Sequence, residues 1–91
     1  IKPLGQTWKG NTFHDRFTLD FECDTFTWEK DGKVTYANKI ISHTAKYDHH
    51  SFTMGQIAAN LTINSHRAVL QLIHFQNCQW IQVTYFCEVG N

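Results

Sequence analysis

The alternation of apolar and polar residues near the C-terminal end constrains the fold more than any other feature of the sequence. In an extended strand, one face of this segment would carry Ile81, Val83, Tyr85, Cys87 and Val89. A period of two is typical of a strand with one buried face. A second apolar run covers 68–75, and the polar residues 76–79 between the two runs suit a hairpin. The sequence therefore predicts a C-terminal β-hairpin with Cys87 in the core.

The length and charge of the chain limit what it can be. Its 91 residues are expected to form a single domain, 1–91. Eight acidic residues balance eight basic ones, so no strong electrostatic field favours nucleic acid or a membrane surface. No apolar run has the length of a membrane span. We expect a monomer with no membrane span and at most a weak contact with RNA.

The three cysteines allow one disulfide and leave one thiol over. Cys23 would lie on the same face of its strand as the apolar residues that precede it. Cys87 would likewise lie on the apolar face of its own strand. We therefore expect a Cys23–Cys87 disulfide, which would stabilise a small domain by roughly 3–4 kcal/mol. Cys78, on the polar link, would be a spare thiol or would form an intermolecular bridge.

Two short features suggest a secreted protein. Ile1-Lys2-Pro3 resembles the start of a chain from which a signal peptide has been removed. Asn60-Leu61-Thr62 has the form of an N-glycosylation sequon, with Asn60 as the candidate acceptor. We expect a mature extracellular protein.

Strands and one helix are predicted in the rest of the chain. Residues 1–15 suggest a loop or an edge strand. Residues 16–24 alternate as a strand, and after residue 24 the apolar residues change from odd to even positions. Asp31-Gly32 indicates a hairpin turn, and 57–63 alternate as a further strand. Between Asn38 and Tyr47 the apolar residues fall at helical spacing, which predicts one short helix. The expected fold is α+β, an antiparallel β-sheet packed with one short helix.

No catalytic or metal-binding motif is present in the sequence. None of the six histidines has cysteine or histidine partners at zinc spacing, and His49-His50 suits a solvated link. Cys78 has no neighbouring base that would make it a nucleophile. The glycines are scattered, so there is no phosphate-binding loop. We expect no metal, no cofactor and no catalytic residue.

Several short segments occur in the order found in one enzyme family. They are the predicted helix, Tyr47-Asp48-His49-His50, the apolar run opened by Arg67, and Asn77-Cys78-Gln79-Trp80. In this order the chain resembles the fungal guanyl-specific ribonucleases. The resemblance covers about 32–87, with gaps, and implies a ribonuclease-like α+β scaffold.

The acid and base of that family are missing, however. Residues 51–66 contain no Asp or Glu, and Tyr85 stands where the family has its last-strand histidine. The loss of both proton-transfer groups would remove on the order of 10⁴-fold or more of the rate. The chain therefore resembles the catalytically inactive ribonuclease-like effectors that powdery-mildew fungi secrete. That resemblance implies delivery into host cells, virulence, binding to host proteins and recognition by immune receptors.

A second resemblance points to an all-β alternative. Cys23, Trp28 and Tyr85-Phe86-Cys87 are similar to the cysteine, tryptophan and Tyr-x-Cys positions of immunoglobulin-like domains. This resemblance implies an all-β sandwich that serves as an extracellular receptor or ligand-binding domain. Against it, only 88–91 follow Cys87, and the helical spacing around Ile40 has no place in such a sandwich.

Both resemblances lead to the same expectation about function. The chain is expected to be a small, secreted, non-catalytic module that binds a host or receptor protein through its polar loops. The candidate contact residues are Asp48, His49, His50, Ser65, His66 and Arg67.

Overall fold

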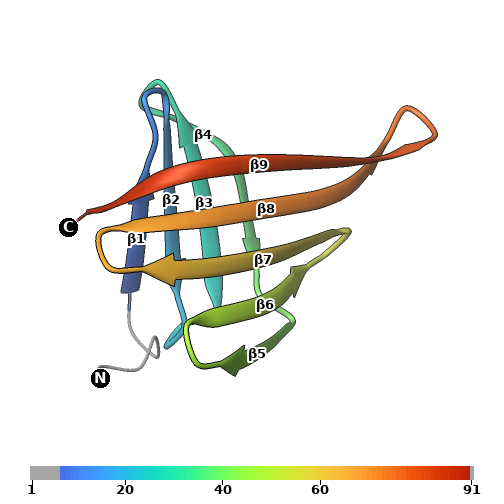
Figure 1. Cartoon of the computed structure of the whole chain (residues 1–91). Coiled ribbons are helices and arrows are strands. Elements are labelled where there is room, and N and C mark those ends of the chain that lie inside the picture. Colours follow the sequence, from blue (N-terminus) through green and yellow to red (C-terminus); the bar gives the residue numbers. More distant parts are fainter. Residues whose placement is uncertain (1–6, 91) are drawn as a thin grey trace.

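The computed structural model describes residues 7–90, which form nine antiparallel β-strands (Figure 1). The strands are β1 (Thr7–Asn11), β2 (Asp15–Asp20), β3 (Thr25–Lys30), β4 (Lys33–Lys39), β5 (Ser42–Lys46), β6 (His49–Met54), β7 (Ile57–Asn64), β8 (Arg67–Gln76) and β9 (Gln79–Gly90). Hydrogen bonds join them into one sheet, in the order β4-β3-β2-β1-β9-β8-β7-β6-β5. Apart from β1 and β9, all neighbours in the sheet are also consecutive in the chain.

The sheet folds over itself into two halves, β1–β4 and β5–β9. Pairs such as Gly10↔Val89 join the halves, and in Figure 1 the strands of the first half run across those of the second. The consecutive strands β4 and β5 are the two edges of the sheet. The link between them crosses from one half to the other: Ile40 N donates to Asp24 O (2.7 Å) and Ile41 N donates to Thr53 O (2.8 Å).

The hydrophobic core lies between the two halves. The buried apolar residues are Trp8, Phe17, Leu19, Phe26, Ile40, Phe52, Met54, Ala59, Leu61, Ala68, Leu70, Leu72 and Cys87. Aromatic rings meet across the two halves, with centroids 4.9 Å apart for Phe17 and Tyr85 and 6.1 Å apart for Phe26 and Phe52. Burial of each large apolar side chain contributes roughly 1.5–3 kcal/mol, so this layer holds the halves together.

The predicted helix is wrong, and with it the α+β class. Residues 7–90 contain no helix; the segment 38–47 forms the end of β4, the Ile40–Ile41 link and β5. Of its apolar residues only Ile40 is buried, while Ile41 and every side chain of β5 are exposed. Because β5 is an edge strand with no buried face, packing imposes no alternation on it, and the helical spacing is accidental. The all-β class of the alternative is right, but all nine strands belong to one sheet.

The predicted hairpins are confirmed. β8 and β9 are joined by Asn77 and Cys78, and β3 and β4 by Asp31 and Gly32. All four turn residues have positive φ, as two-residue turns of the favoured hairpin type require. Cys87 is 1% exposed, as the alternation predicts.

The predicted Cys23–Cys87 disulfide is not formed; all three cysteines are free thiols. Cys23 lies in the β2–β3 turn, where its N–H donates to Asp20 Oδ1 (3.2 Å). Cys87 lies near Asp15, at the other end of β2; burial and, to a smaller extent, the charge of Asp15 raise the pKa of the Cys87 thiol. The five residue steps of β2 span about 17 Å, whereas the Cα atoms of a disulfide are at most about 7 Å apart.

The N-terminal segment contributes more to the sheet than its sequence predicts. β1 is a central strand between β2 and β9, and Trp8 is buried in the core. The rest of the predicted loop or edge strand, 1–6, lies outside the described residues. Within 7–90 no helix is long and apolar enough to cross a membrane.

Candidate functional site

Most of the predicted contact residues lie together at one end of the second half. Asp48 is in the β5–β6 turn, and Ser65 and His66 form the β7–β8 turn. Asp48 O accepts a hydrogen bond from Ile63 N (3.0 Å), which places the two turns side by side. His49, Asp48, Ser65, His66 and Arg67 are all exposed. We call these five residues the turn cluster.

His50 does not belong to the turn cluster, because its side chain points into the protein and is 6% exposed. Its Nδ1 lies 3.1 Å from His43 Nε2, and the His43 ring stacks on Phe21 with centroids 4.1 Å apart. Burial, followed by the neighbouring His43 and His49, lowers the pKa of His50. Burial also lowers the pKa of His43. The expectation of an exposed loop contact at His50 is wrong, because β6 begins at His49 and its alternation turns His50 inward.

A group of exposed aromatic residues lies on the outer face of the β8–β9 hairpin, where sequence reasoning placed no contact. Phe75 is 51% exposed, Trp80 71% and Phe86 76%. Phe75 and Trp80 are cross-strand partners whose rings meet edge to face, with centroids 5.2 Å apart. Phe86 pairs with Val69, six residue steps or about 20 Å along β9 from Trp80, so the aromatic group consists of Phe75 and Trp80. Phe13 and Tyr47 are also exposed, but they lie in separate turns. A single exposed aromatic residue needs no explanation, whereas a group of them marks an interaction surface.

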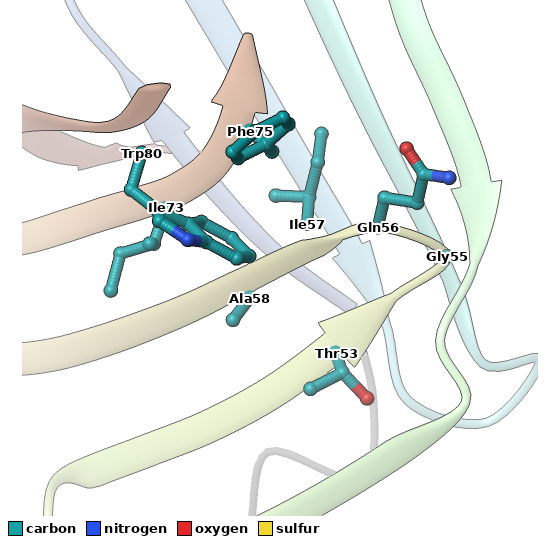
Figure 2. A pocket seen from close by; sticks show the side chains of 8 residues that line it. All are labelled: Thr53, Gly55, Gln56, Ile57, Ala58, Ile73, Phe75 and Trp80. Atoms are coloured by element: carbon teal, nitrogen blue, oxygen red, sulfur yellow. The ribbon is translucent and has the colours of Figure 1, made fainter. Parts of the chain in front are cut away.

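A pocket with a volume of about 570 Å³ lies beside the Phe75–Trp80 pair (Figure 2). We call it the outer pocket; its lining residues are Thr53, Gly55, Gln56, Ile57, Ala58, Ile73, Phe75 and Trp80. Most of these side chains are apolar and none is charged. Its size is within the range of ligand-binding pockets, and such pockets are mostly apolar with a few polar groups. The outer pocket is therefore suited to an uncharged, largely apolar group.

A second pocket of about 390 Å³ lies on the inner side of the same region. We call it the inner pocket; it is lined by Tyr36, Asn38, Gly55, Gln56, Ile57, His74 and Phe75. Its polar groups are already organised: Asn38 Nδ2 donates to the Tyr36 hydroxyl (3.0 Å), and this hydroxyl donates to Met54 O (3.4 Å). The two pockets share Phe75 and the β6–β7 turn, Gly55–Gln56.

The sequence contained a signal for the aromatic group. Phe86 stands among the outward-facing polar positions of β9, between Thr84 and Glu88. Trp80 belongs to the same outward-facing set of alternate residues. Two aromatic residues that face each other in the outward phase of a hairpin, as Phe75 and Trp80 do, indicate an apolar contact surface. The pockets could not be predicted, because they depend on the meeting of β4, the β6–β7 turn and the β8–β9 hairpin.

No group of three or more His, Cys, Asp or Glu residues within 7–90 is arranged to hold a metal ion. Asn60, the candidate glycosylation site, is half-buried on β7 and accepts a hydrogen bond from Ser51 Oγ (2.8 Å). Comparison of the chain with protein-family models, curated proteins and solved structures finds no match.

Proposed function

We propose that this protein is a non-catalytic protein-binding module and that the aromatic group Phe75 and Trp80, with the outer pocket, is its binding surface. The single observation that carries the proposal is the exposed Phe75–Trp80 pair beside an uncharged pocket. Aromatic residues, and Trp in particular, are enriched among the residues that contribute most to binding energy. The partner we propose is a host or receptor protein, met outside the cell, that inserts an uncharged apolar side chain into the outer pocket.

The turn cluster is the weaker candidate for the main contact. It lies at the opposite end of β8, because the eight residue steps from Arg67 to Phe75 span about 26 Å. Arg67 already pairs with Glu88 (Nε–Oε2 3.4 Å), and both side chains are largely exposed. Exposed ion pairs contribute about 0–1 kcal/mol to stability, so this pair does little to hold the turn cluster in one arrangement. It would contribute to a binding site only as a polar rim.

The ribonuclease-like effector scaffold is not part of this proposal. That resemblance needs a helix before Tyr47, and β5 occupies that position. The proposal keeps the expectations of a secreted protein and of binding without catalysis. The proposal is supported by the exposed aromatic residues and by the absence of charge in the outer pocket.

Selection from a displayed library that contains linear peptides and small folded domains tests the proposal. Binders selected on the wild-type protein should lose at least tenfold in affinity on Trp80→Ala, because truncation of a central aromatic residue removes most of its contact energy. Phe13→Ala is the matched control, since Phe13 is 94% exposed and lies in the β1–β2 turn. This variant should bind normally.

Two results would overturn the proposal. One is a set of binders that Trp80→Ala retains at full affinity, which would place the binding surface elsewhere. The other is an equal loss of affinity on Phe13→Ala, which would show non-specific adhesion to exposed aromatic rings. Trp80→Ala must retain the wild-type unfolding midpoint, as expected for a residue that is 71% exposed.

A further inference from the structure

The β8–β9 hairpin extends beyond the strand beside it. β7 pairs with β8 only as far as Ala58↔Ile73, because the chain turns back into β6 at Gly55–Gln56. β8 continues for three more residues, to Gln76, and these pair with β9 alone. His74, Phe75 and Gln76 therefore have a free strand edge on the side where β7 has ended.

The backbone of Phe75 is directed to that free edge. In a two-residue hairpin the closing pair, here Gln76↔Gln79, exchanges hydrogen bonds across the hairpin, and the direction alternates with each residue. The N–H and C=O of Phe75 therefore point away from β9. No backbone hydrogen bond joins Phe75 to the β6–β7 turn or to any other segment among residues 7–90 outside the strand ladders.

The two pockets lie on opposite faces of the sheet beside this edge. The outer pocket contains the outward-facing side chains of Ile73, Phe75 and Trp80. The inner pocket contains His74, which has the inward parity of β8, together with Tyr36 and Asn38 from β4. Successive side chains of an extended chain point to opposite faces. One strand laid along the free edge would therefore fill both pockets with neighbouring residues.

We propose that the partner binds by strand addition: a short, extended, uncharged segment pairs with Phe75 at the free edge of β8. The residue opposite Phe75 inserts an apolar side chain into the outer pocket. A residue next to it places a neutral hydrogen-bonding side chain in the inner pocket, against the Tyr36 hydroxyl and Asn38. In this mode of recognition, backbone hydrogen bonds give affinity and alternate side-chain pockets give specificity. The inference rests on the proposed function and specifies the chemistry of the partner.

The lining of the pockets favours this segment over a charged one. Neither pocket contains an Asp, Glu, Lys or Arg side chain, so a buried charge on the partner would have no opposite charge to pair with. Gly55 also lies close to Asn38, since a Cβ atom at Gly55 would come within 2.8 Å of Asn38 Nδ2. Asn38 thus lies against the β6–β7 turn, where it lines the inner pocket.

The test uses random linear peptides displayed on phage, selected on the whole wild-type protein. The selected peptides should share one apolar or aromatic residue next to one neutral hydrogen-bonding residue. In the complex, hydrogen exchange of the Phe75 amide should slow at least tenfold, while the amide of Ile73, already paired with β7, should change little. N-methylation of the peptide residue opposite Phe75 should weaken binding at least tenfold, and N-methylation of its neighbour should not.

The outcomes separate this inference from the proposed function. Peptides that depend on Trp80 but leave Phe75 exchange unchanged would overturn strand addition and leave a side-chain contact surface. Selection of folded domains alone, with no linear peptide, would overturn it in the same way. Binders that Trp80→Ala retains would overturn both. Asn38→Ala should relax the preference for the hydrogen-bonding residue, and an unchanged preference would contradict the inner-pocket assignment.

Discussion

At the scale of single residues, Gly10 matters because of the ring that lies against it. The Trp8 side chain covers Gly10 on the same face of β1, and a Cβ atom at position 10 would overlap the ring. Gly10→Ala should therefore destabilise the protein by about 1–3 kcal/mol, the usual cost of overpacking a core. Urea unfolding measures this loss. The loss should shrink in the double variant Trp8→Leu/Gly10→Ala, where the smaller side chain makes room; additive effects would show that the two residues do not interact.

Cys87 is a buried thiol without a disulfide partner, and its environment makes it unreactive. Burial, with a smaller contribution from Asp15, raises the pKa of the Cys87 thiol to about 11. Because the thiolate is the reactive form, a thiol reagent at about pH 8 should label the exposed Cys23 and Cys78 in the native protein and Cys87 only after unfolding. Cys23 should react more slowly than Cys78, since the charge of Asp20 raises the pKa of the Cys23 thiol. Mass spectrometry of the labelled protein counts the modified thiols. Three rapidly labelled thiols in the native protein, or a protein that resists labelling at Cys23, would contradict this arrangement.

At the scale of elements, the two-residue turns set the hairpins, and they differ in quality. In the β3–β4 turn Gly32 has φ +82°, whereas in the β8–β9 turn the equivalent position is Cys78, with φ +63°. Left-handed φ costs a non-glycine residue of order 1 kcal/mol. Cys78→Gly should therefore stabilise the protein by about 0.5–1 kcal/mol, and the reciprocal Gly32→Ala should destabilise it by a similar amount. Thermal unfolding measures both, and equal midpoints for the two variants would be inconsistent with strained turns.

These turns also explain which elements the sequence could predict. Asp31-Gly32, Asn77-Cys78 and the turn at Ser65 carry local signals, because they interrupt the apolar alternation with polar residues and because Asp31, Gly32 and Asn77 tolerate left-handed φ. β5 has no such signal. It is an exposed edge strand, so its residues reflect neither a buried face nor a helix stripe. Local patterns therefore identified β2, β3, β4, β7, β8 and β9, failed at β5, missed β6, whose first residues were expected to form a polar link, and did not predict the central position of β1.

At the scale of the whole molecule, the parts that could not be predicted are those set by long-range contacts. The pairing of β1 with β9 joins the first and last described strands, and no local pattern records it. The same pairing fixes the direction of β2. As a result, Cys23 lies beside one end of β2 and Cys87 beside the other. The outer pocket depends on contacts of the same kind. Trp80 and Phe86 were visible in the sequence as outward-facing residues, but the hollow beside Trp80 was not.

The contact between the two halves also makes the stability of the whole molecule sensitive to pH. Phe21, in the β2–β3 turn, stacks on His43 of β5, and His43 bonds to His50 of β6. Burial lowers the pKa of both histidines, although Asp24 opposes this effect at His43 and Asp48 opposes it at His50. The unfolded chain, with histidine pKa values of about 6.5, therefore binds more protons than the native protein just below that pH.

The unfolding free energy should consequently be highest above about pH 6.5 and should fall as the pH is lowered toward about 5.5. Urea unfolding across this range measures the slope. His50→Phe keeps an aromatic ring in the core but removes the titrating pair, so its slope should be flatter than that of the wild type. His66→Gln, at an exposed histidine in the β7–β8 turn, should keep the wild-type slope. If His66→Gln flattens the profile and His50→Phe does not, the pH dependence arises outside the His43–His50 contact.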